Sequence, residues 1–354
     1  MTDDGAWPMI GSGPAHTGYA PTETGPTSNV TERWVFETDG ARASAPAVVD
    51  GTVYVGGGDE HVYALDRADG TERWTFRTGG FVGSPAVVDG TVYVGSGDGC
   101  AYAIDATDGT ERWAVGLGSP ASAPTVVDGT VYVGTRDGEV YAIDAAEGAE
   151  RWRFEADEAV SWSPSVSNGR VYVGTTGMDE GTVYALDTAD GTVQWTFAMD
   201  SYAKSPPAVN DGTVYVGSFG RVYALSTVDG AVEWRHEPGR GVNATPAVAD
   251  GLAYVPEDER VVALDVADGS ERWVVPTNGR KPSSAVVATD TVYVGVSGAM
   301  GPTPGHVHAL AVDDGAERWR FDGVNGVESP VAVVDGTVYV GTVDGSVHAL
   351  AESA

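Results

Sequence analysis

Tryptophan recurs along this chain at an almost constant interval. Self-similarity at a period of about 40 residues is typical of repeat folds, in which each repeat is one unit packed on its neighbours. The chain is therefore an array, and its 354 residues do not indicate two or three independent domains. The intervals are 40, 39, 39, 43, 39, 39 and 46 residues, between Trp34, Trp74, Trp113, Trp152, Trp195, Trp234, Trp273 and Trp319.

Each repeat contains short runs of β-branched and aromatic residues separated by turn residues. In one repeat, the runs 86–88 and 91–95 flank the dipeptide Asp89-Gly90. Asp-Gly between such runs favours a tight β-hairpin, because both residues tolerate positive φ. No helical period occurs anywhere in the chain. The repeat therefore predicts four antiparallel strands, named A to D in chain order, and an all-β propeller.

The two ends of the sequence predict how the ring of blades closes. After Trp319 the chain supplies three strands, over 329–334, 337–341 and 346–350, and no fourth. Residues 31–36 form a D strand without its own A, B and C strands. We expect this N-terminal strand to complete the last blade, giving an eight-bladed propeller of four-stranded antiparallel blades. The predicted organisation is a lead-in segment over 1–30 and one propeller domain over 31–354.

The eight repeated tryptophans have a structural explanation. One lies in each blade, always on the outermost strand, where the gap between radiating sheets is widest. A large ring fills that gap, and its N–H has a neighbouring backbone carbonyl to bond. We therefore expect Trp34, Trp74, Trp113, Trp152, Trp195, Trp234, Trp273 and Trp319 to be docking residues and not a ligand-stacking site.

The charge balance limits the partners of the protein. Net charge is −31, from 51 acidic and 20 basic residues, and the lysines are Lys204 and Lys281. Such a surface repels phosphates, so nucleic acid is not expected as a partner. Dense carboxylates repel one another at low ionic strength, and salt relieves this repulsion. The composition therefore predicts a halophilic protein of the haloarchaeal type.

Cysteine content and the opening residues indicate the compartment. Cys100 is the one cysteine, which excludes a disulfide framework within the chain. No apolar run approaches the roughly 18 residues of a membrane span, and the first residues are acidic where a secretory signal is basic. We expect a cytoplasmic monomer without membrane insertion, or an extracytoplasmic protein if an N-terminal signal has been removed.

The segment between the C and D strands resembles a known repeat. Ala64, Asp66, Gly70 and Trp74 stand where the tryptophan-docking motif of the pyrroloquinoline quinone (PQQ) propeller repeat family has alanine, aspartate, a turn glycine and tryptophan. Four other segments repeat it closely: 103–113, 142–152, 185–195 and 263–273. Ser226 and Ala311 replace the aspartate in the fifth and seventh blades. Residues 7–18 also resemble the lead-in that precedes such propellers.

That resemblance implies one of two classes of protein. The family contains quinoprotein dehydrogenases and non-catalytic relatives that act as interaction platforms, such as the lipoprotein of the bacterial outer-membrane assembly machinery. The dehydrogenases carry a vicinal cysteine pair, a tryptophan floor, a Glu/Asn/Asp metal set and large inserts, none of which can be placed on this sequence. A cofactor with three carboxylates also needs clustered cations, in which the chain is poor. PQQ and calcium are therefore not expected.

Variable loops indicate where binding takes place. The D-to-A connections and B-to-C hairpins emerge on one face, and the repetitive Asp-Gly turns emerge on the other. Loops that vary on a rigid scaffold carry function, and aromatic residues and arginine are enriched at interaction sites. The candidate binding residues are Arg42, Phe81, Trp162, Tyr202, Lys204, Arg240, Asn243, Arg280, Lys281 and Glu328. An alternative is that these groups cap strand ends and occupy the channel mouth without a ligand.

Two groups of side chains raise the question of a metal site. His308 and His348 stand where other blades have tyrosine, so both read as packing residues, and no third ligand accompanies His306 and His308. The acidic run 257–259 reads as solvated loop carboxylates. No metal site and no catalytic residues are predicted.

We expect a non-catalytic scaffold that engages a protein partner through its D-to-A and B-to-C loops. A PQQ-dependent oxidoreductase and a carbohydrate or small-ligand binder are the alternatives.

Overall fold

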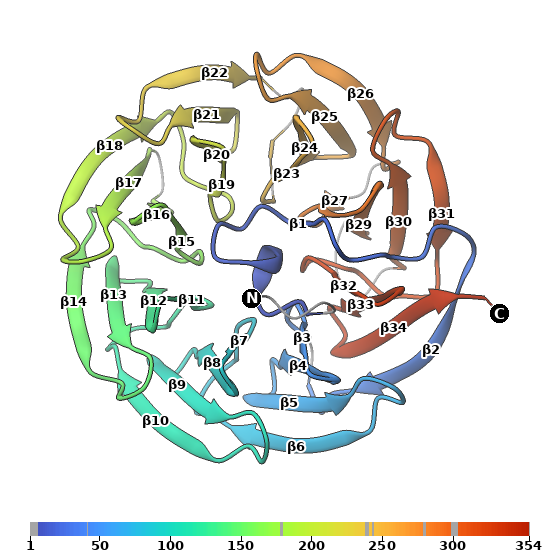
Figure 1. Ribbon diagram of the computed structural model, residues 1–354, viewed down its shortest axis with the longest axis horizontal. Coiled ribbons are helices and arrows are strands. Elements are labelled where there is room, and N and C mark those ends of the chain that lie inside the picture. Colours follow the sequence, from blue (N-terminus) through green and yellow to red (C-terminus); the bar gives the residue numbers. More distant parts are fainter. Residues whose placement is uncertain are drawn as a thin grey trace.

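Eight β-sheets radiate from a central axis in the computed structural model of the chain (Figure 1). The structure describes residues 6–40, 42–177, 180–237, 241–242, 244–278, 281–298 and 304–353. Seven sheets have four strands, and the seventh blade gains two short strands at its margins. The predicted eight-bladed propeller of antiparallel four-stranded blades is confirmed. The chain passes around the ring once, from blue to red in Figure 1.

Successive hairpins build each blade from its inner A strand to its outer D strand. Blades 1 to 4 comprise β3 (Ala47–Val49), β4 (Thr52–Gly56), β5 (His61–Asp66) and β6 (Glu72–Arg77); β7 (Ala86–Val88), β8 (Thr91–Gly95), β9 (Cys100–Asp105) and β10 (Glu111–Gly116); β11 (Thr125–Val127), β12 (Thr130–Gly134), β13 (Glu139–Asp144) and β14 (Glu150–Glu155); and β15 (Ser165–Ser167), β16 (Arg170–Gly174), β17 (Gly181–Asp187) and β18 (Val193–Met199).

The second half of the ring continues the pattern, with additions in blade 7 and a shared blade 8. These blades comprise β19 (Ala208–Asn210), β20 (Thr213–Gly217), β21 (Val222–Ser226) and β22 (Val232–His236); β23 (Ala247–Ala249), β24 (Leu252–Glu257), β25 (Arg260–Asp265) and β26 (Glu271–Pro276); β28 (Val286–Ala288), β29 (Thr291–Ser297), β30 (His306–Ala311) and β31 (Glu317–Phe321) with β27 (Lys281–Pro282) and β1 (Tyr19–Ala20); and β32 (Ala332–Val334), β33 (Thr337–Gly341), β34 (Ser346–Glu352) and β2 (Val30–Glu37).

The ring closes in blade 8, where the N-terminal strand β2 pairs antiparallel with the C-terminal strand β34. The register joins Val30 to Glu352 and Glu37 to Ser346. Glu352 also accepts hydrogen bonds from the backbone N–H groups of Thr27 and Ser28, and these bonds hold the pKa of its carboxyl below the ordinary value. Both ends of the chain are thereby held in one sheet, which confirms the predicted closure.

Each repeated tryptophan connects its blade to the next one. Its indole N–H donates a hydrogen bond of 2.7–3.0 Å to a carbonyl oxygen in the following C-to-D turn, or to Pro26 where blade 8 has no such turn. The turn glycine also lies against the ring: a Cβ on Gly109 would stand 2.8 Å from Trp74. The motif of alanine, aspartate, glycine and tryptophan therefore encodes the contact between blades.

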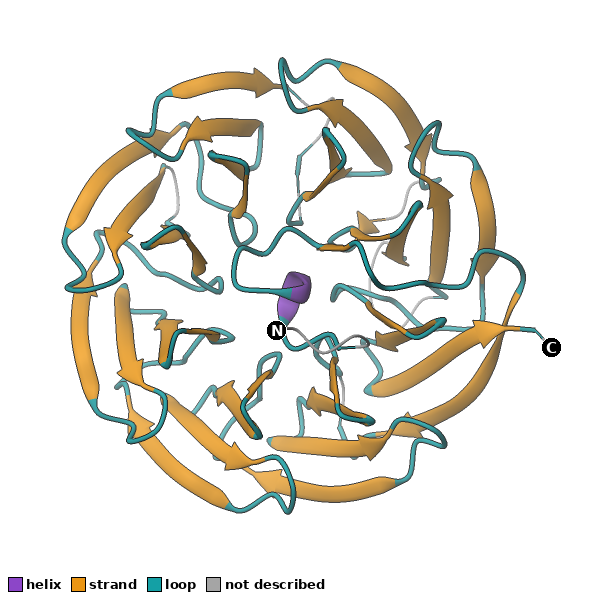
Figure 2. Ribbon diagram, viewed as in Figure 1, coloured by secondary structure: helices purple, strands orange, loops and turns teal. Residues whose placement is uncertain are grey.

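The lead-in crosses the central channel and contacts every blade (Figure 2). It includes one short 3₁₀ helix, η1 (Ile10–Ser12), which lies near the axis. In blade 3 the contact is made by the His16 ring with Thr125. In the other seven blades a backbone N–H donates a bond of 2.7–2.8 Å to a lead-in carbonyl: Val48 to Trp7, Val87 to Pro8, Val166 to Pro14, Val209 to Ala15, Val248 to Thr17, Val287 to Gly18 and Gly336 to Thr24.

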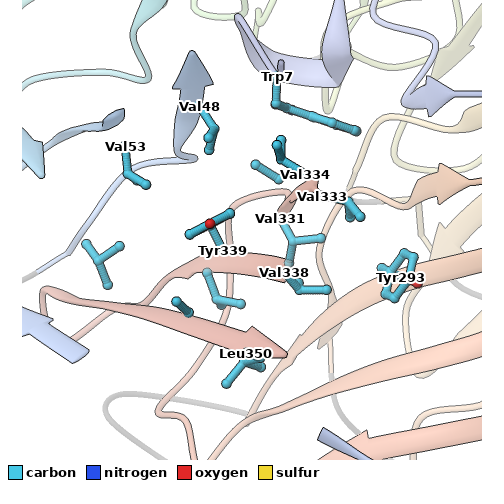
Figure 3. Close-up of a cluster of buried hydrophobic side chains, with 14 of the residues drawn as sticks. Trp7, Val48, Val53, Tyr293, Val331, Val333, Val334, Val338, Tyr339 and Leu350 are labelled. Atoms are coloured by element: carbon cyan, nitrogen blue, oxygen red, sulfur yellow. The ribbon is translucent and has the colours of Figure 1, made fainter. Parts of the chain in front are cut away.

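The apolar core consists of clusters between adjacent blades. Figure 3 shows the cluster at the closure of the ring, where Trp7 of the lead-in lies with Val48 and the valines of blade 8. Trp7 is 1% exposed, so its ring is part of the core. The N-terminal segment thus contributes apolar contacts as well as backbone hydrogen bonds to the inner strands. No helix among the described residues is long and apolar enough to cross a membrane.

Candidate binding cavity

A cavity of about 1160 Å³ opens at the centre of the face that carries the D-to-A connections and the B-to-C hairpins. We call this face the cavity face, and the face with the A-to-B and C-to-D turns the opposite face. Ile10 of the lead-in also lines the cavity. Every blade contributes a lining side chain: Arg42, Phe81, Arg136, Trp162, Lys204, Thr245, Lys281 and Glu328.

Six of the ten residues expected to bind a partner line this cavity. They are Arg42, Phe81, Trp162, Lys204, Lys281 and Glu328. Tyr202 lies beside the wall, with the Lys204 ammonium 5.1 Å from the centre of its ring. Arg240, Asn243 and Arg280 lie outside the described residues. The structure therefore brings together side chains that are separated by up to 286 residues.

The cavity wall carries more positive than negative charge, although the protein as a whole is strongly acidic. Four cations line it, Arg42, Arg136, Lys204 and Lys281, against one described carboxylate, Glu328. Arg42 forms an ion pair with Glu328. The other three cations have no carboxylate within ion-pair distance among the described residues. Both lysines of the sequence therefore line a cavity whose one described carboxylate is already paired with Arg42.

Arginines on the opposite face behave differently. Arg73, Arg112 and Arg151 each pair with an aspartate of the same blade, at 2.7–2.9 Å. The Arg112 guanidinium lowers the pKa of the Asp105 carboxyl, and the other two pairs show the same direction and cause. These three arginines are thus neutralised by the repeat itself. Arg33, Arg170 and Arg235 also lack a carboxylate partner among the described residues, but they do not line the cavity, whereas Arg136, Lys204 and Lys281 gather around it.

Trp162 stands at the cavity mouth with its ring partly open to solvent. Its exposed fraction is 37%, whereas the eight docking tryptophans lie between blades. The indole N–H donates a 3.0 Å hydrogen bond to the carbonyl of Ala203 in the next blade, which fixes the orientation of the ring. An indole held by its edge presents a rigid apolar face at little further entropic cost, which suits a binding surface.

Lys204 lines the adjoining part of the cavity, and Phe219 lies beside it without lining the cavity. The Lys204 ammonium lies 5.5 Å from the ring centre of Phe219 and is also beside Tyr202, in the range of cation–π contacts. Phe219 comes from the B-to-C hairpin of blade 5 and is 56% exposed. On the other side of Trp162, the Arg136 guanidinium lies 5.8 Å from the ring centre of Phe81, which is 44% exposed. Aromatic rings and cations therefore alternate around the rim.

Sequence reasoning missed Arg136 and Phe219. Both lie in B-to-C hairpins, at the position where blades 1 and 2 have Gly58 and Gly97. Gly97 has a visible role, because a Cβ there would stand 2.6 Å from the Phe81 ring. Alignment of the repeats at this hairpin position, where a bulky residue replaces glycine, would have identified both side chains. The D-to-A loops gave the stronger sequence signal because they hold both lysines of the chain and Trp162.

Two buried hydroxyl groups in the wall have no hydrogen-bond partner among the described residues. They belong to Ser205 and Ser297, which are 1% and 6% exposed. Both residues line the cavity, in blades 5 and 7. A buried hydroxyl without a partner costs free energy, and a ligand that supplies donors or acceptors recovers it. The wall therefore offers polar groups as well as charge.

The acidic run 257–259 includes a side chain with a structural role. Within the described ranges, no group of three or more His, Cys, Asp or Glu side chains is placed to hold a metal ion. The interpretation of residues 257–259 as solvated carboxylates was wrong for Glu257, which is fully buried. Its carboxylate contacts the His236 Nε2 at 2.9 Å and the Arg260 Nε at 2.5 Å. Pairing with two cationic or donor groups is what permits its burial.

Comparison of sequences identifies a family for the repeats. A family model described as outer membrane protein assembly factor BamB matches residues 27–123, 102–204, 179–302 and 303–354, and so covers the propeller. No curated protein matches the chain.

Comparison of structures finds a similar propeller in BamB and in dehydrogenases, among other proteins. BamB from Moraxella catarrhalis has a TM-score of 0.76 at 19% identity, over 92% of this chain and 98% of that one. A quinohemoprotein alcohol dehydrogenase from Comamonas testosteroni has a TM-score of 0.83 at 17% identity, over 99% and 81%. Another from Pseudomonas putida has a TM-score of 0.81 at 18% identity, over 98% and 80%. At these identities the similarity establishes the fold alone.

Proposed function

Because this chain belongs to the BamB family of PQQ-like repeat propellers, we propose that it is a non-catalytic scaffold that engages a protein partner through its cavity face. The single observation that carries the proposal is the rim of the cavity. Partly exposed aromatic rings and cations converge there from loops of different blades: Phe81, Arg136, Trp162 and Lys204, with Phe219 beside Lys204. Aromatic residues and arginine are the types enriched where proteins bind proteins.

The propeller neighbours also include dehydrogenases, so we tested the cavity against the needs of calcium-bound PQQ. Cys100, the one cysteine, lies on β9 and does not line the cavity, and burial and the nearby Asp98 raise the pKa of its thiol. Glu328 is the one described carboxylate of the wall, and it is paired with Arg42. A divalent cation of this kind takes several oxygen ligands. The donor set therefore does not fit, which favours the scaffold over the oxidoreductase.

Two exposed side chains of the same blade offer a direct test of the scaffold. Phe219 lies on the cavity face, and Val228, which is 73% exposed, lies in the C-to-D turn of the opposite face. A photoreactive phenylalanine analogue at each position, in protein expressed in its native host and irradiated at high salt, should crosslink a partner from position 219 and not from 228. Equal crosslinking from both positions, or crosslinking from 228 alone, would contradict the proposal.

Substitution of cavity residues tests the same proposal by a second route. Trp162→Ala and Lys204→Glu should each reduce the amount of partner that co-purifies, while circular dichroism and the melting temperature stay close to those of the parent protein. Retention of the partner by both variants would show that this rim is not the docking surface. An absorption spectrum that changes on addition of PQQ and calcium would instead support the oxidoreductase.

A further inference from the structure

The cavity wall has an excess of positive charge that nothing in the described part of the chain neutralises. Arg136, Lys204 and Lys281 come from three different blades and have no described ion-pair partner. A protein with 51 acidic residues nevertheless places none of the described ones opposite these three groups. A carboxylate beside these three groups would relieve the repulsion between them, so the lack of one among the described residues indicates that negative charge comes from a ligand.

We propose that the cavity receives an acidic segment of the partner protein, whose carboxylates pair with Lys204, Lys281 and Arg136. This inference rests on the proposed scaffold function. A folded acidic surface does not fit inside the wall, whereas an extended segment or loop does. Aromatic or apolar side chains of the segment would lie against Trp162 and Phe81 at the mouth. The unpartnered hydroxyls of Ser205 and Ser297 offer hydrogen bonds to polar groups of the segment.

The size of the cavity favours a peptide segment over a small anion. Sites for small ligands typically enclose about 300 to 1,000 Å³. This cavity measures about 1160 Å³, and its cations stand on separate blades. A single small polyanion would need them gathered at one point, as in a bidentate carboxylate or phosphate site. A chain that carries several carboxylates along its length matches charges that are spread around a wall.

The net charge of the protein makes this site selective. An acidic segment is repelled by the rest of a surface with a net charge of −31 and attracted only at the cavity. Screening in concentrated salt removes the long-range part of both effects, because the Debye length falls to about 3 Å at 1 M. Direct contacts within the wall are screened less. Binding at high salt is therefore expected to depend on contacts with individual cations and aromatic rings.

The test uses a fluorescently labelled peptide of alternating Glu and Tyr with the full-length protein in molar KCl. Fluorescence anisotropy should show saturable binding of this peptide and none of a peptide of alternating Lys and Tyr. The double variant Lys204→Glu/Lys281→Glu should bind the acidic peptide about tenfold more weakly or worse. The neutral variant Lys204→Gln/Lys281→Gln should give an intermediate affinity, which separates loss of charge from charge reversal.

A matched control changes the net charge equally at a distance from the cavity. Arg77 and Arg272 lie on the outer strands β6 and β26, and their side chains are 70% and 59% exposed. Arg77→Glu/Arg272→Glu should retain the parent affinity. Equal loss in both double variants, or equal binding of the acidic and basic peptides, would overturn the proposal.

Two further measurements distinguish an acidic segment from a small anion, and distinguish failure of this inference from failure of the proposed scaffold function. Millimolar citrate should not displace the peptide; complete displacement by citrate would assign the cavity to small anions instead. If position 219 crosslinks a partner but the acidic peptide does not bind, the scaffold function is supported and the acidic segment is rejected as the occupant of the cavity. If the acidic peptide binds but position 219 crosslinks no partner, the scaffold function is rejected and the cavity is supported as a site that binds acidic segments.

Discussion

The indole N–H of Trp319 donates a 2.7 Å hydrogen bond to the carbonyl oxygen of Pro26, a residue 293 positions earlier in the chain. The Tyr293 hydroxyl donates to the same oxygen at 3.0 Å. In other blades the equivalent acceptor belongs to the C-to-D turn, as Ala106 does for Trp74 and Tyr54. Blade 8 has no such turn because its C and D strands come from opposite ends of the chain. The segment before β2 supplies the missing acceptor.

Removal of the N-terminal segment should therefore destabilise the whole ring. Deletion of residues 1–37 removes β2, the Pro26 acceptor and the lead-in bonds to the inner strands. We expect the loss of cooperative thermal unfolding, equivalent to several kcal/mol, because a buried aromatic and an entire strand lose their partners. Circular dichroism melts would report it. Deletion of residues 353–354 is the control, and a native melt after the large deletion would contradict the closure mechanism.

Gly109→Ala should destabilise the protein more than Gly90→Ala. Both glycines have positive φ, 76° and 69°, so both substitutions carry a similar backbone cost of roughly 1 kcal/mol. A Cβ on Gly109 meets the Trp74 ring at 2.8 Å, whereas a Cβ on Gly90 meets nothing within 4 Å. The added overpacking should cost about 1–3 kcal/mol more. Chemical denaturation of the two variants measures the difference, and equal midpoints would show that the turn does not pack tightly on the indole.

His16 should make stability fall as the pH falls below neutrality. The ring is buried, and burial lowers its pKa from 6.5 to about 4. Above pH 6.5 the ring is neutral in both the folded and the unfolded chain. Between the two values the unfolded chain binds a proton that the folded chain does not, so stability decreases with falling pH and levels off below about 4. The loss amounts to roughly 3 kcal/mol at most.

Comparison with His16→Asn isolates this contribution. Asparagine stays neutral at every pH and tolerates the positive φ of 51° at this position. Melting temperatures of the two proteins should converge between pH 6.5 and 4, because the variant lacks the titrating ring, while titration of the carboxylates affects both alike. A constant difference across this range would mean that His16 is not neutral in the folded protein.

Low ionic strength should destabilise the propeller. Its net charge of −31 produces repulsion that concentrated KCl screens, since the Debye length grows from about 3 Å at 1 M to about 30 Å at 0.01 M. Thermal melts over a KCl series should show midpoints that rise with salt. Sucrose serves as a control, because it stabilises folded proteins without screening charge. A midpoint independent of KCl would refute the halophilic interpretation.

The fold was predictable because the tryptophan interval, the strand runs and the turn residues all recur with the same period. The tryptophan interval fixed the number of blades, and the unmatched strand at 31–36 predicted the closure that β2 and β34 form. Details that occur once were not predictable in this way. His16 has no counterpart in the repeat, and its contacts with Thr125 and Ser165 join residues that are 109 and 149 positions away.

Some residues of the candidate site were likewise predictable from the sequence, and others were not. Lys204, Lys281 and Trp162 stood out because they depart from a cation-poor or repeated background, and the structure places them around one cavity. Arg136 and Phe219 lie in four-residue hairpins like those of blades 1 and 2, so one substitution in each hairpin was the whole signal. Burial of Glu257 depends on contacts with His236 and Arg260 from neighbouring strands, which the acidic run 257–259 alone does not reveal.

The position of Ile10 in the lining of the cavity has a mechanical consequence. Since the segment around it spans the axis and is bonded to the inner strands, the described chain lies across the path that would run through the ring. A guest must leave by the route it entered, so a polymer cannot be threaded through the ring. Only a free terminus or the tip of a protruding loop can reach the bottom, and exchange of one guest for another requires complete withdrawal of the first.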